Sequence, residues 1–226
     1  MADGNSGLLS PIENAIMPVA AAIPLPQLKV WLSAYFHPVE TFESEQAKLT
    51  GGIGGYILKN LVSIGLLFGV ILGIVGAALM LFIGNIPGAL MFFAFALVGG
   101  VLDMLILIPI GSGIYWVIAK ILGGKGALLK QLMGMMLIVG GAVFLTLPFQ
   151  ILQAIPVVGI VFGFASILVW LYSVYSQYRL IKSIHCLSPT KAAAVIIIPY
   201  IILVIVLGAA ILSILALFGL GGFIGK

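Results

Sequence analysis

The sequence predicts an all-α integral membrane protein with five transmembrane helices, preceded by short amphipathic helices near the N-terminus. Hydrophobic residues make up 63% of the 226 residues and charged residues only 7%, whereas about a quarter of a soluble domain is charged. Apolar runs longer than about 18 residues recur from residue 58 onward, which is typical of helices that span a bilayer. This composition excludes a soluble enzyme and a nucleic-acid-binding protein, and it makes the lipid bilayer the first expected partner.

Residues 1–57 form a predicted cytosolic or interfacial region of their own, and they contain five of the six acidic residues. The segment Ser10-Pro11-Ile12-Glu13 has the spacing of a capping box with proline at the first helical position, so a helix is expected to begin there. Two further short helices are expected over residues 27–36 and 38–49. Aromatic residues beside lysines favour helices that lie on the lipid head groups. For residues 1–26, a disordered tail is the alternative.

Residues 58–226 form the predicted transmembrane domain, in which five apolar blocks are separated by short polar or glycine- and proline-rich segments. The five predicted spans cover residues 58–83, 89–119, 128–152, 156–181 and 190–220. The second block exceeds the roughly 20 residues that a bilayer requires. This excess indicates a tilted helix, a kink at Pro109 or a protruding end.

The basic residues predict the orientation of the spans. Nine of the ten Lys and Arg residues lie before or at the start of the first span, or between or at the facing ends of spans two and three or of spans four and five. Because basic residues accumulate on the cytosolic side, the N-terminus is expected in the cytosol and the C-terminus outside.

Small residues recur at four-residue intervals on two of the predicted spans. Such spacing places them on one stripe of a helix, where a second helix can approach closely. Either neighbouring helices of one bundle or the two copies of a homodimer would meet there. The predicted helix-packing residues are Gly65, Gly69, Gly73 and Ala77 on the first span, and Gly159 and Gly163 on the fourth.

Asp103 is the only acidic residue within a predicted span. A charge at the bilayer centre costs about 2.5–3.5 kcal/mol or more, so intramembrane acids are candidates for function. Thr146 and Gln150 are candidate partners and complete a predicted intramembrane polar site. One interpretation is a hydrogen bond that ties two helices together, and the other is an ion or proton site of a small transporter or channel.

No catalytic, metal or cofactor motif is present in the sequence. Paired intramembrane aspartates, a histidine-glutamate zinc motif and a phosphate-binding glycine loop are all missing. One histidine and one cysteine, His185 and Cys186, are too few ligands for a metal site. The sequence therefore predicts a protein that is not an enzyme and that needs no cofactor.

Three segments resemble the Yip-one domain family, whose members are five-span membrane proteins named for their interaction with Ypt/Rab GTPases. The likeness runs from about residue 28 to residue 215. It implies a helical membrane protein with a cytosolic N-terminus and no known catalytic activity. The segments are LKVWLSAYFHPVETFE at 28–43, AKILGGKGALLKQ at 119–131 and SQYRLIKSIHCLSPTKAAAVIIIPY at 176–200.

The eukaryotic members of this family act in trafficking at the Golgi and the endoplasmic reticulum. This sequence lacks an acidic Asp-Leu-Tyr-Gly stretch before the first span, and it is closer to the prokaryotic members. The expected location is the cell membrane in a prokaryote and the Golgi or endoplasmic reticulum in a eukaryote.

The expected function is membrane organisation, trafficking or partner recruitment through the cytosolic face, without catalysis. A protein partner is expected at the N-terminal region, where Glu40, Glu43 and Glu45 form an acidic patch. A homodimer is a further alternative. A small transporter or channel that uses Asp103 is the competing function.

Overall fold

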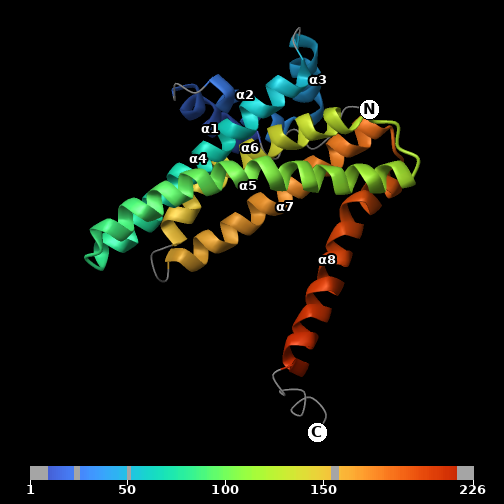
Figure 1. Ribbon diagram of the computed structural model, residues 1–226. Helices are drawn as coiled ribbons and strands as arrows, with labels where there is room; N and C mark the ends of the chain where they lie inside the picture. Colours follow the sequence, from blue (N-terminus) through green and yellow to red (C-terminus); the bar gives the residue numbers. More distant parts are fainter. Residues whose placement is uncertain (1–9, 23–25, 50–51, 154–157, 218–226) are drawn as a thin grey trace.

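The computed structural model describes residues 10–22, 26–49, 52–153 and 158–217, and all regular structure in these residues is α-helical (Figure 1). A disordered tail is the alternative for residues 1–26, and of these the structure describes residues 10–22 as α1 and residue 26 as the start of α2. Residues 1–9 and 23–25 lie outside the described residues. In chain order the helices are α1 (Ser10–Ala22), α2 (Pro26–Phe36), α3 (Pro38–Lys48), α4 (Ile53–Phe82), α5 (Ile86–Ile121), α6 (Leu128–Gln153), α7 (Val158–His185) and α8 (Pro189–Leu217).

Five of the described helices, α4 to α8, are long and apolar enough to cross a membrane. The predicted fold class is therefore confirmed. The first span begins earlier than predicted, because α4 starts at Ile53 and contains residue 58 in its interior. The predicted start of the fourth span at residue 156 and the predicted end of the fifth at residue 220 lie outside the described residues.

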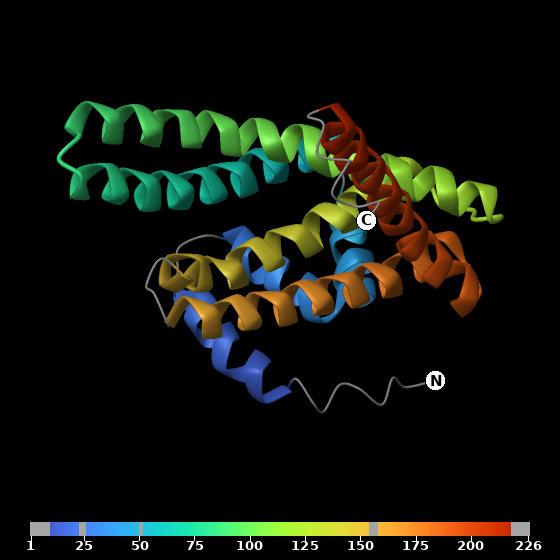
Figure 2. The same ribbon diagram turned by 90° about the horizontal axis from the view of Figure 1, so that it is seen from below.

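Helices α4 and α5 form a long hairpin, and α6 and α7 form a second antiparallel pair (Figure 2). A glycine ends α4, because Gly84 has a φ of 77°, a conformation that residues with a side chain rarely adopt. The Asn85 N–H then donates to the Met80 carbonyl at 2.9 Å. The Asn85 side chain in turn accepts a hydrogen bond from the Gly88 N–H and caps the start of α5.

Helix α2 is part of the bundle core, a packing that the sequence did not predict. Its side chains Leu28, Trp31, Leu32 and Tyr35 are all buried. It packs mainly on α6 and also touches α7. A methyl group at Gly140 or Gly141 of α6 would lie under 3 Å from Trp31, so these two glycines let α2 approach closely.

Helices α1 and α3 flank α2 and are fixed to the bundle by specific contacts. The His37 imidazole lies 2.9 Å from the Glu13 carboxylate and joins α1 to the start of α3. Phe42 of α3 is buried in the core. Glu45 accepts hydrogen bonds from Lys48 at 2.6 Å and from Tyr56 of α4 at 3.0 Å. The N-terminal helices are thus held in defined positions.

Helix α8 leaves the bundle at a steep angle (Figure 1). Only its first turns pack on the other helices, through Ala192, Val195 and Ile196, which are buried with Ile118 and Ile181. From residue 201 to residue 214 nearly all of its side chains are exposed and almost entirely apolar. These residues present an apolar surface of the kind that faces lipid.

Candidate functional site

The basic end of the bundle is where α5 ends and α7 passes into α8. Both helices end in a turn that satisfies their last carbonyl groups. At the end of α5, Gly123 has a φ of 89° and the Gly124 N–H donates to the Ala119 carbonyl at 2.7 Å. At the end of α7, Cys186 has a φ of 52° and the Leu187 N–H donates to the Lys182 carbonyl at 3.1 Å.

A buried polar chain connects three spans just below this end. Gln131 of α6 donates from Nε2 to the Ser112 carbonyl of α5 at 2.8 Å. Its Oε1 accepts a hydrogen bond from His185 Nε2 of α7 at 2.5 Å. Both Gln131 and His185 are fully buried. The chain therefore fixes the relative positions of α5, α6 and α7 at the basic end.

The glycine-rich loop after α5 packs directly on His185. The Lys125 N–H donates to the His185 carbonyl at 3.1 Å. A methyl group at Gly124 would lie 2.7 Å from His185 Nδ1, so a residue with a side chain does not fit there. The loop is therefore anchored on the bundle, and the Trp116 indole also donates to the Gly126 carbonyl at 3.2 Å.

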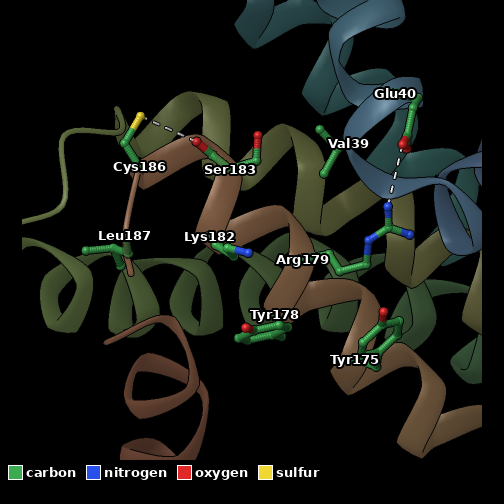
Figure 3. A pocket seen from close by; sticks show the side chains of 9 residues that line it. All are labelled: Val39, Glu40, Tyr175, Tyr178, Arg179, Lys182, Ser183, Cys186 and Leu187. Carbon is green, nitrogen blue, oxygen red and sulfur yellow. Dashed lines mark hydrogen bonds and ion pairs between the residues drawn. The ribbon is translucent and has the colours of Figure 1, made fainter. Parts of the chain in front are cut away.

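A groove of about 410 Å³ lies between the start of α3 and the last turns of α7 (Figure 3). We call it the α3–α7 groove. Val39 and Glu40 line it from α3, and the remaining walls come from α7 and the residues that follow it. These walls consist of Tyr175, Tyr178, Arg179, Lys182, Ser183, Cys186 and Leu187.

Two cations and one carboxylate face this groove. Arg179 Nη2 donates to Glu40 Oε1 over 3.5 Å, a long distance for an ion pair. The Arg179 side chain is only 18% exposed, whereas that of Glu40 is 62% exposed. Lys182 lies in the last turn of α7, where a positive charge is favourable because helix carbonyl groups point toward it.

Hydroxyl groups of α7 hold the end of α2 beside the α3–α7 groove. Ser176 Oγ donates to the Tyr35 carbonyl at 2.7 Å, and the Tyr172 hydroxyl donates to the Phe36 carbonyl at 3.3 Å. These carbonyl groups have no partner within α2 itself. The Tyr35 hydroxyl donates to the Val169 carbonyl at 2.5 Å. Burial, aided by the neighbouring Tyr172, raises the pKa of Tyr35 well above its usual range.

Among the described residues, no hydrogen bond links the three residues of the predicted intramembrane polar site. Asp103 is exposed on α5 and has no hydrogen bond or ion pair with any described residue. The Thr146 hydroxyl donates to the Ala142 and Val143 carbonyl groups of its own helix at 3.0 Å. Gln150 has a buried Oε1 without a partner among the described residues.

The glycine stripe of the first span packs inside this chain, against α5. A methyl group at Gly65 would lie 2.6 Å from Val101 Cα, and one at Gly69 would lie 2.6 Å from the Ala96 carbonyl oxygen. Gly73 faces the Phe93 ring. The stripe continues through Gly76, which contacts Phe92, whereas the predicted Ala77 is only half-buried.

The two glycines predicted on the fourth span have different surroundings among the described residues. The atoms nearest to a methyl group at Gly159 would be backbone atoms of Gln153, at the neighbouring end of α6. At Gly163 a methyl group would have no neighbour within 4 Å among the described residues.

Sequence reasoning overlooked two polar residues that matter for packing, Asn60 and Gln131. Asn60 is buried and accepts a hydrogen bond from the Trp31 indole at 2.9 Å. Each is an amide side chain near the start of a span, and such groups need a partner when they are buried. Their presence in apolar segments was the available signal. Their partners could not be read from it, because Trp31 and His185 lie far away in sequence.

Metal chemistry has no support in the described residues, where no cluster of three or more His, Cys, Asp or Glu side chains could hold a metal ion. The Nε2 atom of His185 is hydrogen-bonded to Gln131, and the neighbouring Cys186 is exposed.

The arrangement defines a class: a multi-pass helical membrane protein with five apolar spans and a polar, basic end. A family model for the Yip1 domain matches residues 32–211, which is most of the chain. The chain therefore belongs to the Yip1 domain family, as the three segments suggested. No curated protein and no solved structure gives a significant match.

Proposed function

We propose that this Yip1-domain protein is not an enzyme and that it recruits a protein partner to the membrane through the exposed face of α3. The observation that supports this proposal is that α3 is fixed on the bundle with its acidic face outward. Phe42 and Glu45 are buried, whereas Glu40 and Glu43 are exposed. A docked helix loses little conformational freedom on binding, so its exposed face is prepared for a partner.

The charge distribution supports a cytosolic location for this face. Lysine and arginine residues gather at the end of the bundle where α7 terminates, and Glu40 is joined there to Arg179. In the proposed orientation the N-terminus is cytosolic and the C-terminus lies on the opposite side.

Site-specific photocrosslinking in native membranes tests partner recruitment. A photoreactive amino acid at Glu43 should give a discrete protein adduct. The same group at Leu203, on the exposed apolar part of α8, should give lipid adducts alone. An adduct with twice the mass of the chain would identify a second copy as the partner. Equal adduct patterns from the two positions, or no protein adduct at Glu43, would contradict the proposal.

Transport through Asp103 is tested separately by flux in liposomes. A non-transporting protein should give the same proton permeability as its Asp103→Asn variant. A flux that disappears in Asp103→Asn would replace partner recruitment with transport as the function.

A further inference from the structure

We propose that the α3–α7 groove binds the phosphate of an anionic glycerophospholipid. This inference deepens the proposed function, since it names a lipid for the same face of the molecule. Its test is separate from the crosslinking experiment, because lipid binding and protein recruitment can each fail while the other holds.

The groove offers several groups that suit a phosphate. Arg179 and Lys182 lie one helical turn apart on α7 and both line it. In the part of the chain described here, the Lys182 ammonium group forms no hydrogen bond or ion pair. The hydroxyl groups of Tyr178 and Ser183 add neutral donors to the same walls (Figure 3). Charge-assisted hydrogen bonds from such cations to phosphate are stronger than neutral ones.

Glu40 is a weak competitor for these cations. Its carboxylate reaches Arg179 only at 3.5 Å and is mostly exposed. A phosphate can therefore take its place at the guanidinium while the Glu40 side chain turns into solvent. Among the residues that line the groove, Arg179 and Lys182 carry positive charges and only Glu40 carries a negative one.

The position and the walls of the groove favour a lipid over a soluble phosphate compound. Lys182 lies in the last turn of a transmembrane helix, the depth at which lipid head groups meet a span. Val39, Leu187 and the rings of Tyr175 and Tyr178 form the less polar part of the lining. Tyrosine rings beside cations are typical of the membrane interface. A glycerol backbone can pack against this part while its phosphate meets the cations.

Native mass spectrometry of the full chain in detergent, with phosphatidylglycerol or phosphatidylcholine added, tests this proposal. We expect clear preference for phosphatidylglycerol in the wild type. Lys182→Gln should weaken phosphatidylglycerol binding about fivefold, the effect of one lysine near an anionic membrane surface. Lys125→Gln is the matched control, because Lys125 lies at the same end of the bundle but does not line the groove, and it should change binding less than twofold.

A second pair of variants tests the carboxylate. Glu40→Gln removes the competitor and should strengthen phosphatidylglycerol binding. Glu43→Gln removes the same charge from the same helix outside the groove and should leave binding nearly unchanged. A gain in Glu40→Gln alone would support the groove, and equal gains in both variants would point to general charge attraction and contradict it.

Three further results would overturn the proposal. Equal wild-type affinity for the two lipids would exclude an anion-selective site. An equal loss in Lys182→Gln and Lys125→Gln would show diffuse attraction in place of a site. Displacement of phosphatidylglycerol by glycerol 3-phosphate or inorganic phosphate at equimolar concentration would identify a soluble phosphate compound as the ligand.

Discussion

Gly65 shows how a single residue controls the approach of two spans. A methyl group there would press on the backbone of α5, 2.6 Å from Val101 Cα. Because backbone atoms cannot rotate away, the two helices would have to separate. The predicted stripe of small residues on α4 is therefore covered by α5 of the same chain and is not a free surface.

Gly65→Ala should lower the free energy of unfolding by about 1–3 kcal/mol, the usual cost of overpacking. Gly163→Ala is the matched control, because a methyl group at Gly163 meets no described neighbour. It should be neutral or stabilising by up to about 1 kcal/mol, since alanine favours helices over glycine. Thermal unfolding in detergent measures both variants. If Gly65→Ala proved as stable as Gly163→Ala, the close packing of α4 on α5 would be incorrect.

Asp103 forms no hydrogen bond or ion pair with any described residue, whereas a tie between helices requires a partner. Its side chain is exposed on a helix whose other exposed residues include Leu102, Ile106 and Leu107. A polar side chain in this setting adds cost without a compensating hydrogen bond.

Asp103→Leu should consequently leave stability unchanged or raise it by up to about 2–3 kcal/mol, the cost of an acid at membrane depth. Gln131→Leu, which breaks two buried hydrogen bonds, should lower it by about 1–3 kcal/mol per stranded group. Thermal unfolding in lipid nanodiscs compares the two variants. A loss of stability in Asp103→Leu would show that the folded protein does give Asp103 a partner, such as a second copy.

At the scale of elements, the five spans follow from the sequence and the place of α2 does not. Long apolar runs bounded by glycine, proline and lysine locate α4 to α8, because the bilayer selects for length and hydropathy alone. Helix α2 has only eleven residues, and its pattern of apolar and polar residues suits both a helix on the lipid head groups and a helix packed inside a bundle. Its burial depends on Gly140 and Gly141, whose role appears only when α6 lies beside it.

The same reasoning applies to the α3–α7 groove. Tyr175, Tyr178 and Arg179 are near neighbours in the sequence, but their spacing alone does not predict a groove. Glu40 and Arg179 are 139 residues apart, so their contact is a product of tertiary packing. Helix periodicity can place residues on one helix face, and it cannot pair faces of different helices.

Trp31→Ala should lower the free energy of unfolding by about 3–5 kcal/mol, because it empties a packed site and removes the hydrogen bond to Asn60. Trp170→Ala is the control, since Trp170 is about half exposed on α7, and its cost should be much smaller. Thermal unfolding in one detergent gives the comparison. Similar stabilities of the two variants would place α2 on the surface and not in the core.

At the scale of the whole molecule, the odd number of candidate spans predicts that the two ends of the transmembrane region lie on opposite sides of the membrane. The turn between α4 and α5 lies at one end of the bundle, and the loop after α5 lies at the other (Figure 1). The proposed orientation assigns the first to the outside and the second to the cytosol.

Cysteine labelling in intact cells measures this orientation. In a Cys186→Ala background, Asn85→Cys should react with an impermeant thiol reagent and Lys125→Cys should react only after the membrane is opened. The two sites control for each other, because both lie in loops at helix ends. The reverse pattern of labelling would invert the proposed orientation.

The hydrogen bonds of α2 also impose an order on assembly. Tyr35 pairs with Val169 and Ser176, which are 134 and 141 residues away along the chain. A ribosome adds about 5–20 residues per second, so these partners are made roughly 7 to 28 seconds after α2. Helix α2 cannot reach its final environment before the fourth span is synthesised. During that interval an amphipathic helix can lie at the membrane interface. This explains why α2 has the sequence pattern of an interfacial helix and yet is buried in the finished protein.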